Sequence, residues 1–316
     1  MNDFISKFID YNVTKFNQEL HLEKFVKSLQ YSYDWAQNNM ICFLIESDGE
    51  HALIMMEDEK NNWAYFGYLK FNSEKSIKLW SKIETFCKSK QINSLLGPIQ
   101  GSTYFPYRCI NKTDGRGFFQ GEYFSDQTDA KILNNLKPSK IINYRSAIRE
   151  KYNNVMEISK PYYDKLCQKG LRVELVNELD ESSLKSIFEI VQTVFSKNWG
   201  YQEIGYAHFK KLFSNGESNI SRMSMHKIMY QDKLIGFSRY TEESSDTIIF
   251  KTIGILPEYQ KMGIGNAVVY QMHADALDFG YSKAIYALVR TSNRVKNMPQ
   301  PDVFEFRTYQ AFEFNF

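Results

Sequence analysis

The stretch that decides the fold of the second half is TIIFKTIGILPEYQKMGIGNAVVYQMHADALDF, residues 247–279. β-Branched and aromatic residues fill 247–256 and predict a strand. Pro257 then turns the chain, and a helix with an apolar stripe is expected over 263–279. The run KAIYALVR at 283–290 predicts a further strand. The stretch therefore predicts a strand–helix–strand unit with two glycines where the helix begins.

The loop between this strand and this helix suits an anion such as a pyrophosphate. The first N–H groups of a helix have no partner within it and carry about half a positive charge. Gly263 and Gly265 have no Cβ, so a phosphate can approach the backbone, and Lys261 adds a positive charge. Neither the Walker pattern nor the third glycine of a dinucleotide fingerprint is present. The alternative is an ordinary turn with two incidental glycines, and the surrounding strand, proline and helix favour the phosphate site.

Both halves of the chain show the same order of predicted elements, which indicates a duplicated fold. The predicted strands are 40–46, 51–57, 62–71, 92–99, 140–149, 170–179, 226–230, 233–240, 247–256, 283–290 and 304–314, and the predicted helices are 73–90, 129–137, 180–196, 206–213 and 263–279. In the helix at 73–90 we expect Ile77, Trp80, Ile83 and Phe86 to form the buried stripe. The polar segment 150–170 contains Pro161 and Gly170, and predicts the boundary between the halves.

Composition excludes several classes of protein. The chain has 316 residues, 43% hydrophobic and 24% charged, which favours two ordinary globular domains. A net charge of +2 argues against a nucleic-acid partner. No apolar run approaches the ~18 residues that span a membrane, and residues 1–4 do not begin a secretory signal. The four cysteines are far apart, so we expect reduced thiols, no metal site and a cytoplasmic protein.

The pattern Gln260-x-x-Gly263-x-Gly265 after such a strand resembles the coenzyme A-binding motif of the GNAT acyltransferase superfamily. The element order from 170 to 316 resembles the GNAT fold, and the first half, with Leu96-Gly97-Pro98-Ile99, is similar to the degenerate copy in bacterial tandem-GNAT proteins. The resemblance implies an α/β (α+β) fold of two tandem domains, 1–155 and 156–316, each a mixed, mostly antiparallel sheet flanked by helices. In the first domain the matching loop, 72–75, has no glycine and carries an acid, so we expect a structural or substrate-shaping role there.

The resemblance also implies acetyl-CoA, or coenzyme A, as the cosubstrate. The main chain of Ile253 and Ile255 would pair with the pantetheine arm, Gly254 would mark a β-bulge, and Asn293 would contact the arm. The residues expected to hold the pyrophosphate are Gln260, Lys261, Met262, Gly263, Ile264, Gly265 and Asn266. No metal is expected.

Catalysis would need a group that removes a proton from the acceptor amine, whose pKa is near 10.4 for a lysine-like amine. Glu258 is the acid nearest to the motif. Many GNAT enzymes carry a tyrosine acid in a helix after the asparagine, but here Pro299 and Pro301 end any such helix, and Tyr309 on the last strand is the distant substitute. The alternatives are a solvated surface acid for Glu258 and a half-buried strand residue for Tyr309.

Other titratable residues favour ordinary packing or solvation over chemistry. This group comprises Glu242, Glu243, His208, His226, His273 and Cys109. The leading hypothesis is an acyl-CoA-dependent N-acyltransferase that acts on a small-molecule or peptide amine. The alternatives are a non-catalytic acyl-CoA-binding or scaffold protein and a transferase that uses aminoacyl-tRNA, against which the near-neutral charge argues.

Overall fold

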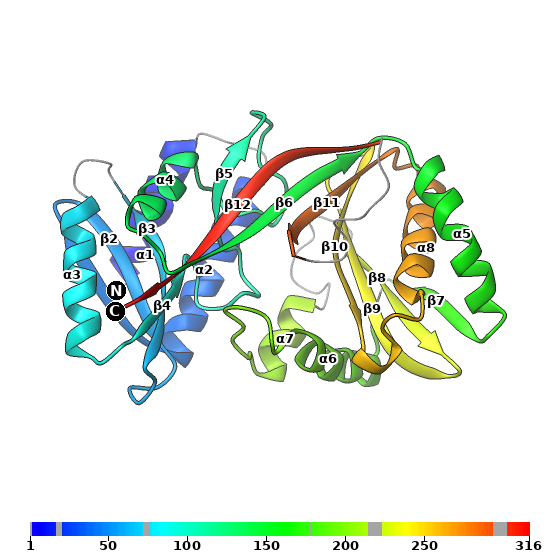
Figure 1. Cartoon of the computed structure of the whole chain (residues 1–316), viewed down its shortest axis with the longest axis horizontal. Coiled ribbons are helices and arrows are strands. Elements are labelled where there is room, and N and C mark those ends of the chain that lie inside the picture. Colours follow the sequence, from blue (N-terminus) through cyan, green and yellow to red (C-terminus); the bar gives the residue numbers. More distant parts are fainter. Residues whose placement is uncertain (1, 17–20, 72–75, 177, 214–222, 293–301) are drawn as a thin grey trace. The chain divides into compact units, whose positions relative to one another are not determined.

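The chain forms two compact units in a computed structural model that describes residues 2–16, 21–71, 76–176, 178–213, 223–292 and 302–316 (Figure 1). The first unit comprises Met1–Tyr144 and Arg307–Phe316, and the second comprises Arg145–Phe306. Strands β6 (Lys140–Arg149) and β12 (Val303–Asn315) therefore each run from one unit into the other. These borders differ from the predicted 155/156 division, because the end of β12 is buried in the core of the first unit. The roles predicted for domains 1–155 and 156–316 stay predictions.

The first unit is a mixed sheet with helices. Its elements are α1 (Asn2–Phe16), α2 (Leu22–Asn39), β1 (Ile41–Ser47), β2 (Glu50–Met56), β3 (Trp63–Lys70), α3 (Ser76–Ser89), β4 (Ser94–Gly97), β5 (Cys109–Thr113) and α4 (Gln127–Asn135), with parts of β6 and β12. The strand order is β1-β2-β3-β4-β12, and β5 also pairs with β12. Strands β1, β2 and β3 pair antiparallel, whereas β3 and β4 pair parallel.

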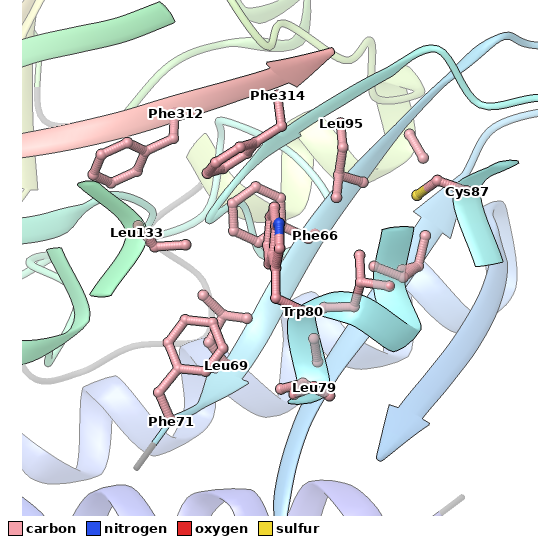
Figure 2. Close-up of a cluster of buried hydrophobic side chains, with 14 of the residues drawn as sticks. Phe66, Leu69, Phe71, Leu79, Trp80, Cys87, Leu95, Leu133, Phe312 and Phe314 are labelled. Carbon is pink, nitrogen blue, oxygen red and sulfur yellow. The ribbon is translucent and has the colours of Figure 1, made fainter. Parts of the chain in front are cut away.

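The core of the first unit joins residues that are far apart in the sequence. Phe66 from β3, Trp80 from α3 and Phe314 from β12 pack together, and the ring centroids of Trp80 and Phe314 lie 4.3 Å apart (Figure 2). Phe312 and Phe314 are 0% and 4% exposed. The last strand of the chain therefore completes the first unit rather than the second.

The structure confirms most of the predicted elements of the first unit and corrects one stripe. The hairpin β1–β2 turns through Asp48 and Gly49 at positive φ, as expected for a tight turn. Helix α3 buries Leu79, Trp80 and Ile83, but Ile77 is 71% exposed. The predicted stripe was wrong at Ile77 because a strict spacing of three drifts around a helix of 3.6 residues per turn. Helices α1 and α2 and strand β5 were not predicted.

The second unit repeats the strand–helix–strand plan. Its further elements are α5 (Asn153–Cys167), β7 (Leu171–Val176), α6 (Glu181–Phe195), α7 (Tyr206–Phe213), β8 (Met223–Tyr230), β9 (Lys233–Glu242), β10 (Thr247–Ile255), the short 3₁₀ helix η2 (Pro257–Tyr259), α8 (Ile264–Asp278) and β11 (Lys283–Arg290). The strand order is β6-β11-β10-β9-β8-β7. Strands β7 to β10 pair antiparallel, and β10 and β11 pair parallel. The α/β fold with mixed, mostly antiparallel sheets is thus confirmed.

None of the helices described here is long and apolar enough to cross a membrane.

The predicted boundary segment 150–170 is in fact mostly a helix. Helix α5 lies beside α8, and both contribute to one apolar cluster over the sheet (Figure 1). Its buried side chains include Val155, Ser159 and Leu166, whereas Pro161 is exposed within the helix. The exposed polar residues and the proline hid the short buried face. The segment was therefore interpreted as the boundary between the halves, and its helix was not predicted.

A buried chain of hydrogen bonds ties β6, β11 and α8 together. The Arg149 Nε–H donates to the Tyr286 hydroxyl oxygen at 2.8 Å, and the Tyr286 hydroxyl donates to His273 Nε2 at 2.6 Å. The His273 Nδ1–H donates to the Val269 carbonyl at 2.6 Å. The Val269 carbonyl can only accept, so Nδ1 carries a proton, and in the neutral imidazole Nε2 is then the acceptor for the Tyr286 hydroxyl. Burial lowers the pKa of His273 to about 4.

This network predicts a loss of stability in acid. Because the folded state lowers the His273 pKa from 6.5 to about 4, the unfolded state binds the proton first as the pH falls. We expect the free energy of unfolding to fall by roughly 3 kcal/mol between pH 6.5 and pH 4 from this residue. Urea unfolding of wild type and His273→Gln across this pH range measures the free energy of unfolding. In the variant this free energy should depend less steeply on pH. His208→Gln is the control, and an equal slope in all three proteins would contradict the assignment.

Candidate functional site

Among the described residues, no strand pairs with one edge of β10 beyond Phe250. The Leu256 N–H donates to the Ile235 carbonyl at 2.9 Å, so this residue points its main chain toward β9. Because successive residues of a strand alternate, the main-chain groups of Ile253 and Ile255 point away from β9. The Gln260 side chain donates to the Ile255 carbonyl at 2.9 Å. The edge predicted to take the pantetheine arm is therefore turned in the required direction.

Strands β10 and β11 part before this edge. Their parallel pairing runs from Thr247–Lys283 to Phe250–Tyr286. The register of β10 against β9 shifts between Phe250 and Thr252, which places a β-bulge at the same level. Gly254 instead pairs regularly with Phe237, so the bulge predicted at Gly254 was wrong. The structure needs a glycine at 254 for another reason: a Cβ there would lie 2.8 Å from the Phe237 ring.

The loop after β10 bends sharply before α8. Helix η2 begins at Pro257, and the Gln260 side chain bond to Ile255 closes the turn against the end of β10. Lys261 and Gly263 have φ of 69° and 88°, and Gly263 is the N-cap of α8. Successive backbone N–H groups in turns of this kind can form a concave site for an anion.

The N–H groups of this loop are largely available. The Asn266 N–H donates to the Gly263 carbonyl at 3.0 Å, so it is already satisfied. In the part of the chain that the structure describes, the Ile264 and Gly265 N–H groups have no acceptor. A Cβ on Gly265 would meet no atom within 4 Å, so open space lies above its backbone. The loop therefore fits a pyrophosphate, which needs free N–H donors and close access to the backbone.

The matching position in the first unit is closed. Strands β3 and β4 pair only from Trp63–Ser94 to Tyr65–Leu96. Beyond this point the Ile99 N–H donates to the Phe66 carbonyl at 2.8 Å, and the Tyr68 N–H donates to Gln100 Oε1 at 2.7 Å. Gln100 is fully buried, and a Cβ on Gly67 would lie 2.1 Å from the Ile99 carbonyl oxygen. The chain's own residues 99–100 thus occupy the edge that stays open in the second unit.

The two predicted catalytic residues lie in different surroundings. Glu258 is exposed, and its carboxylate lies 3.8 Å from the ammonium of Lys233, which is exposed as well. Tyr309 belongs to the first unit, where its buried hydroxyl donates to Glu122 Oε1 at 2.6 Å. The two side chains therefore belong to different units. Asn293 lies outside the described residues.

Tyr309 is part of a buried ionic network. Arg307 donates to Glu122 Oε2 at 2.5 Å, and both side chains are almost fully buried. Burial raises the pKa of Glu122 in spite of the neighbouring Arg307. The Arg307 guanidinium also donates to the carbonyls of Arg116 and Gly117. This network holds β12 to the loop after β5, which favours a structural role for Tyr309.

Other predicted packing residues take part in buried contacts. His226 Nδ1 lies 2.8 Å from Ser238 Oγ, and His226 Nε2 lies 2.6 Å from Asp275 Oδ2. Since His226 and Ser238 are fully buried, this trio braces α8 on the sheet rather than facing solvent. Burial also raises the pKa of the Cys109 thiol, which keeps it protonated and unreactive. Among the described residues, no three His, Cys, Asp or Glu side chains converge on a metal position.

Sequence analysis missed one residue beside the candidate site, Tyr162, and one at the matching position of the first unit, Gln100. Tyr162 of α5 lies against Gly263, with ring atoms 2.8 and 3.4 Å from the Cβ that another residue would carry. Gln100 closes the first unit. Tyr162 was missed because segment 150–170 was interpreted as the boundary between the halves and not as a helix.

Comparison with known proteins identifies the second unit. Residues 184–296 match the family model described as Acetyltransferase (GNAT) family. The structure of a GCN5-related N-acetyltransferase from Anabaena variabilis superposes with a TM-score of 0.52 at 10% identity, over 99% of this chain and 70% of that one. A tandem GNAT protein from the clavulanic acid biosynthesis pathway superposes with a TM-score of 0.49 at 9% identity, over 85% of this chain and 81% of its own. No curated protein matches the sequence. The predicted GNAT superfamily is confirmed for residues 184–296, and the likeness to the Anabaena variabilis structure is one of fold.

The two loop glycines should respond differently to alanine. Gly263→Ala forces a Cβ into a left-handed residue and toward Tyr162, so we expect a loss of about 1–2 kcal/mol of stability. Gly265→Ala adds a Cβ in open space within α8, so stability should rise by about 0.5–1 kcal/mol. The same Cβ would keep a phosphate from the backbone, so coenzyme A affinity should fall on the order of tenfold. Thermal unfolding and calorimetric titration measure both effects. Unchanged affinity in Gly265→Ala would contradict the phosphate site.

Tyr309→Phe separates a structural from a catalytic role. Loss of the hydrogen bond to the buried Glu122 should cost about 1.5–3 kcal/mol of unfolding free energy. Coenzyme A affinity and any acyl-transfer rate below the unfolding transition should stay at wild-type values. Urea unfolding and a transfer assay at 20 °C below the midpoint provide the comparison. A variant of normal stability with a large fall in rate would restore Tyr309 as a catalytic residue.

Proposed function

Because residues 184–296 belong to the GNAT acetyltransferase family, we propose that the chain is an acyl-CoA-dependent N-acyltransferase that uses acetyl-CoA and an amine acceptor. The observation that carries the proposal is the combination in the second unit of an open strand edge and a loop with free N–H groups. The open edge lies beyond the Phe250–Tyr286 pair, and the loop begins α8. The two features are joined by the short segment 256–263, so one extended ligand would reach both.

The residues of this chain divide the binding of coenzyme A between them. The loop from Lys261 to Gly265 would hold the pyrophosphate through main-chain N–H groups, and Lys261 would add a positive charge. The outward main-chain groups of Ile253 and the N–H of Ile255 would pair with the amide groups of the pantetheine arm. Bound acetyl-CoA would supply the acetyl group as a thioester. A main-chain N–H on the open edge of β10 would stabilise the negative charge that develops on the thioester oxygen.

The acceptor amine must lose a proton before it attacks, and the exposed Glu258 is a weak candidate for its base. Its carboxylate is exposed to solvent and already faces the Lys233 ammonium. This position favours a second candidate function, a non-catalytic acyl-CoA-binding protein. Both functions require the same cofactor site and differ only in turnover. The acceptor class, the absence of a nucleic-acid partner and the cytoplasmic localisation stay predictions.

The proposal predicts one coenzyme A site per chain. The first unit closes its own strand edge with Ile99 and Gln100, so only the second unit can pair with a pantetheine arm. Calorimetric titration of acetyl-CoA should give one site, and the site should be lost in Gly265→Glu. A screen of amine acceptors that follows release of free thiol then separates the transferase from the binding protein. No heat of binding at millimolar acetyl-CoA would refute both, and two sites would refute the closure of the first unit.

A further inference from the structure

Helix α5 places an exposed aromatic ring beside the candidate phosphate loop. The helix runs antiparallel to α8: Tyr152, just before α5, contacts His273 late in α8, and Tyr163 contacts Tyr270 nearer its start, with ring centroids 4.9 Å apart in both pairs. Tyr162, in the last turns of α5, reaches Gly263 at the N-cap of α8. Packing of the two helices therefore fixes where this ring lies.

The Tyr162 ring is held on one side and open on the other. Its edge atoms fill the space that a Cβ at position 263 would need. The residue is nevertheless 44% exposed, so almost half of its surface faces solvent. A large aromatic that is anchored but uncovered, directly beside an anion site, has the properties of a platform for a flat ligand group.

The direction in which coenzyme A would lie decides which of its parts would contact Tyr162. A pyrophosphate in coenzyme A has the pantetheine arm on one side and the adenosine on the other. The open edge of β10 takes the pantetheine arm, which leads from the loop along the sheet. The adenosine must then leave the loop away from that edge, and Tyr162 contacts the loop at Gly263, the N-cap of α8.

We propose that Tyr162 is a binding residue for the adenine of coenzyme A, and that its ring packs against the base. This inference rests on the proposed function, because it requires coenzyme A at the α8 loop. Stacking on an aromatic ring does not need hydrogen-bonding partners, so it suits an exposed position. Helix α5, which belongs to the second unit, would then complete the nucleotide site.

The test compares coenzyme A with 4′-phosphopantetheine, which keeps the pantetheine arm and one phosphate but lacks the adenosine. Binding is measured by competition against acetyl-CoA with wild type, Tyr162→Ala and Tyr162→Phe. Loss of one stacked base costs about 10-fold in affinity, within the range found for aromatic residues that stack on bases. We expect Tyr162→Ala to bind coenzyme A about 10-fold more weakly and 4′-phosphopantetheine as well as wild type does, and Tyr162→Phe to match wild type on both.

The matched control is Lys160→Ala on the same helix, where the exposed ammonium pairs with Asp164 rather than with the loop. This variant should bind both ligands like wild type, and far-ultraviolet circular dichroism checks the fold of all variants. An equal loss for both ligands in Tyr162→Ala would show that the ring only supports the loop, and unchanged affinity for coenzyme A would remove it from the site. Either result overturns the inference and leaves the proposed function intact. Failure of wild type to bind coenzyme A would overturn both.

Discussion

The parting of β10 from β11 after the Phe250–Tyr286 pair is the constraint on which the second unit's site depends. A strand between two neighbours normally satisfies its main-chain groups on both sides. Here the bulge at 250–252 and the divergence of β11 leave one side of Ile253 and Ile255 without a strand partner. Such an edge is costly if it stays dry and empty, and it is stabilised by water or by a ligand that offers amide groups of its own. The buried chain from Arg149 through Tyr286 to His273 fixes β11 and α8 at the level where the strands part.

In the first unit, the main-chain groups on the matching side of β3 are hydrogen-bonded by the chain itself. Its strands β3 and β4 also stop pairing early, but the chain after β4 continues along β3 and donates and accepts the missing hydrogen bonds. The buried Gln100 side chain acts there as an amide group does in a ligand, because its Oε1 accepts from the Tyr68 N–H. The first unit thus satisfies the hydrogen bonds of this strand edge with its own residues, whereas the second unit leaves them for a ligand. This difference lies in a few residues after β4, while the strand–helix–strand order of β3, α3 and β4 is the same as that of β10, α8 and β11.

The sequence predicted the repeating elements well because their signals are local. The turn at Asp48-Gly49 and the two glycines where α8 begins appear as expected. Segment 150–170 and the last strand were misplaced, because burial of Val155 and Leu166 against α8, and of Phe312 and Phe314 in the first unit, depends on partners distant in sequence. The loop of the candidate site could be read from the glycine spacing. The closing role of Gln100 and the position of Tyr162 could not, because nothing local in sequence marks which side chain fills a gap between two strands or covers a glycine.

Gly263 shows how these levels combine at one residue. Its positive φ turns the chain into α8 and orients the amides of the loop. A turn that favours glycine would explain this feature alone. Its missing Cβ also makes room for Tyr162, which belongs to a helix that precedes it by some hundred residues in a 316-residue chain. A turn that served only to start a helix would not need a neighbouring ring. A loop that held the middle of a long ligand would benefit from one, because the pyrophosphate charge fixes the ligand at its centre and an apolar surface can then orient the end that leaves the sheet. The packing of α5 on α8, both in the second unit, therefore places the Tyr162 ring beside the loop that is proposed to hold the pyrophosphate.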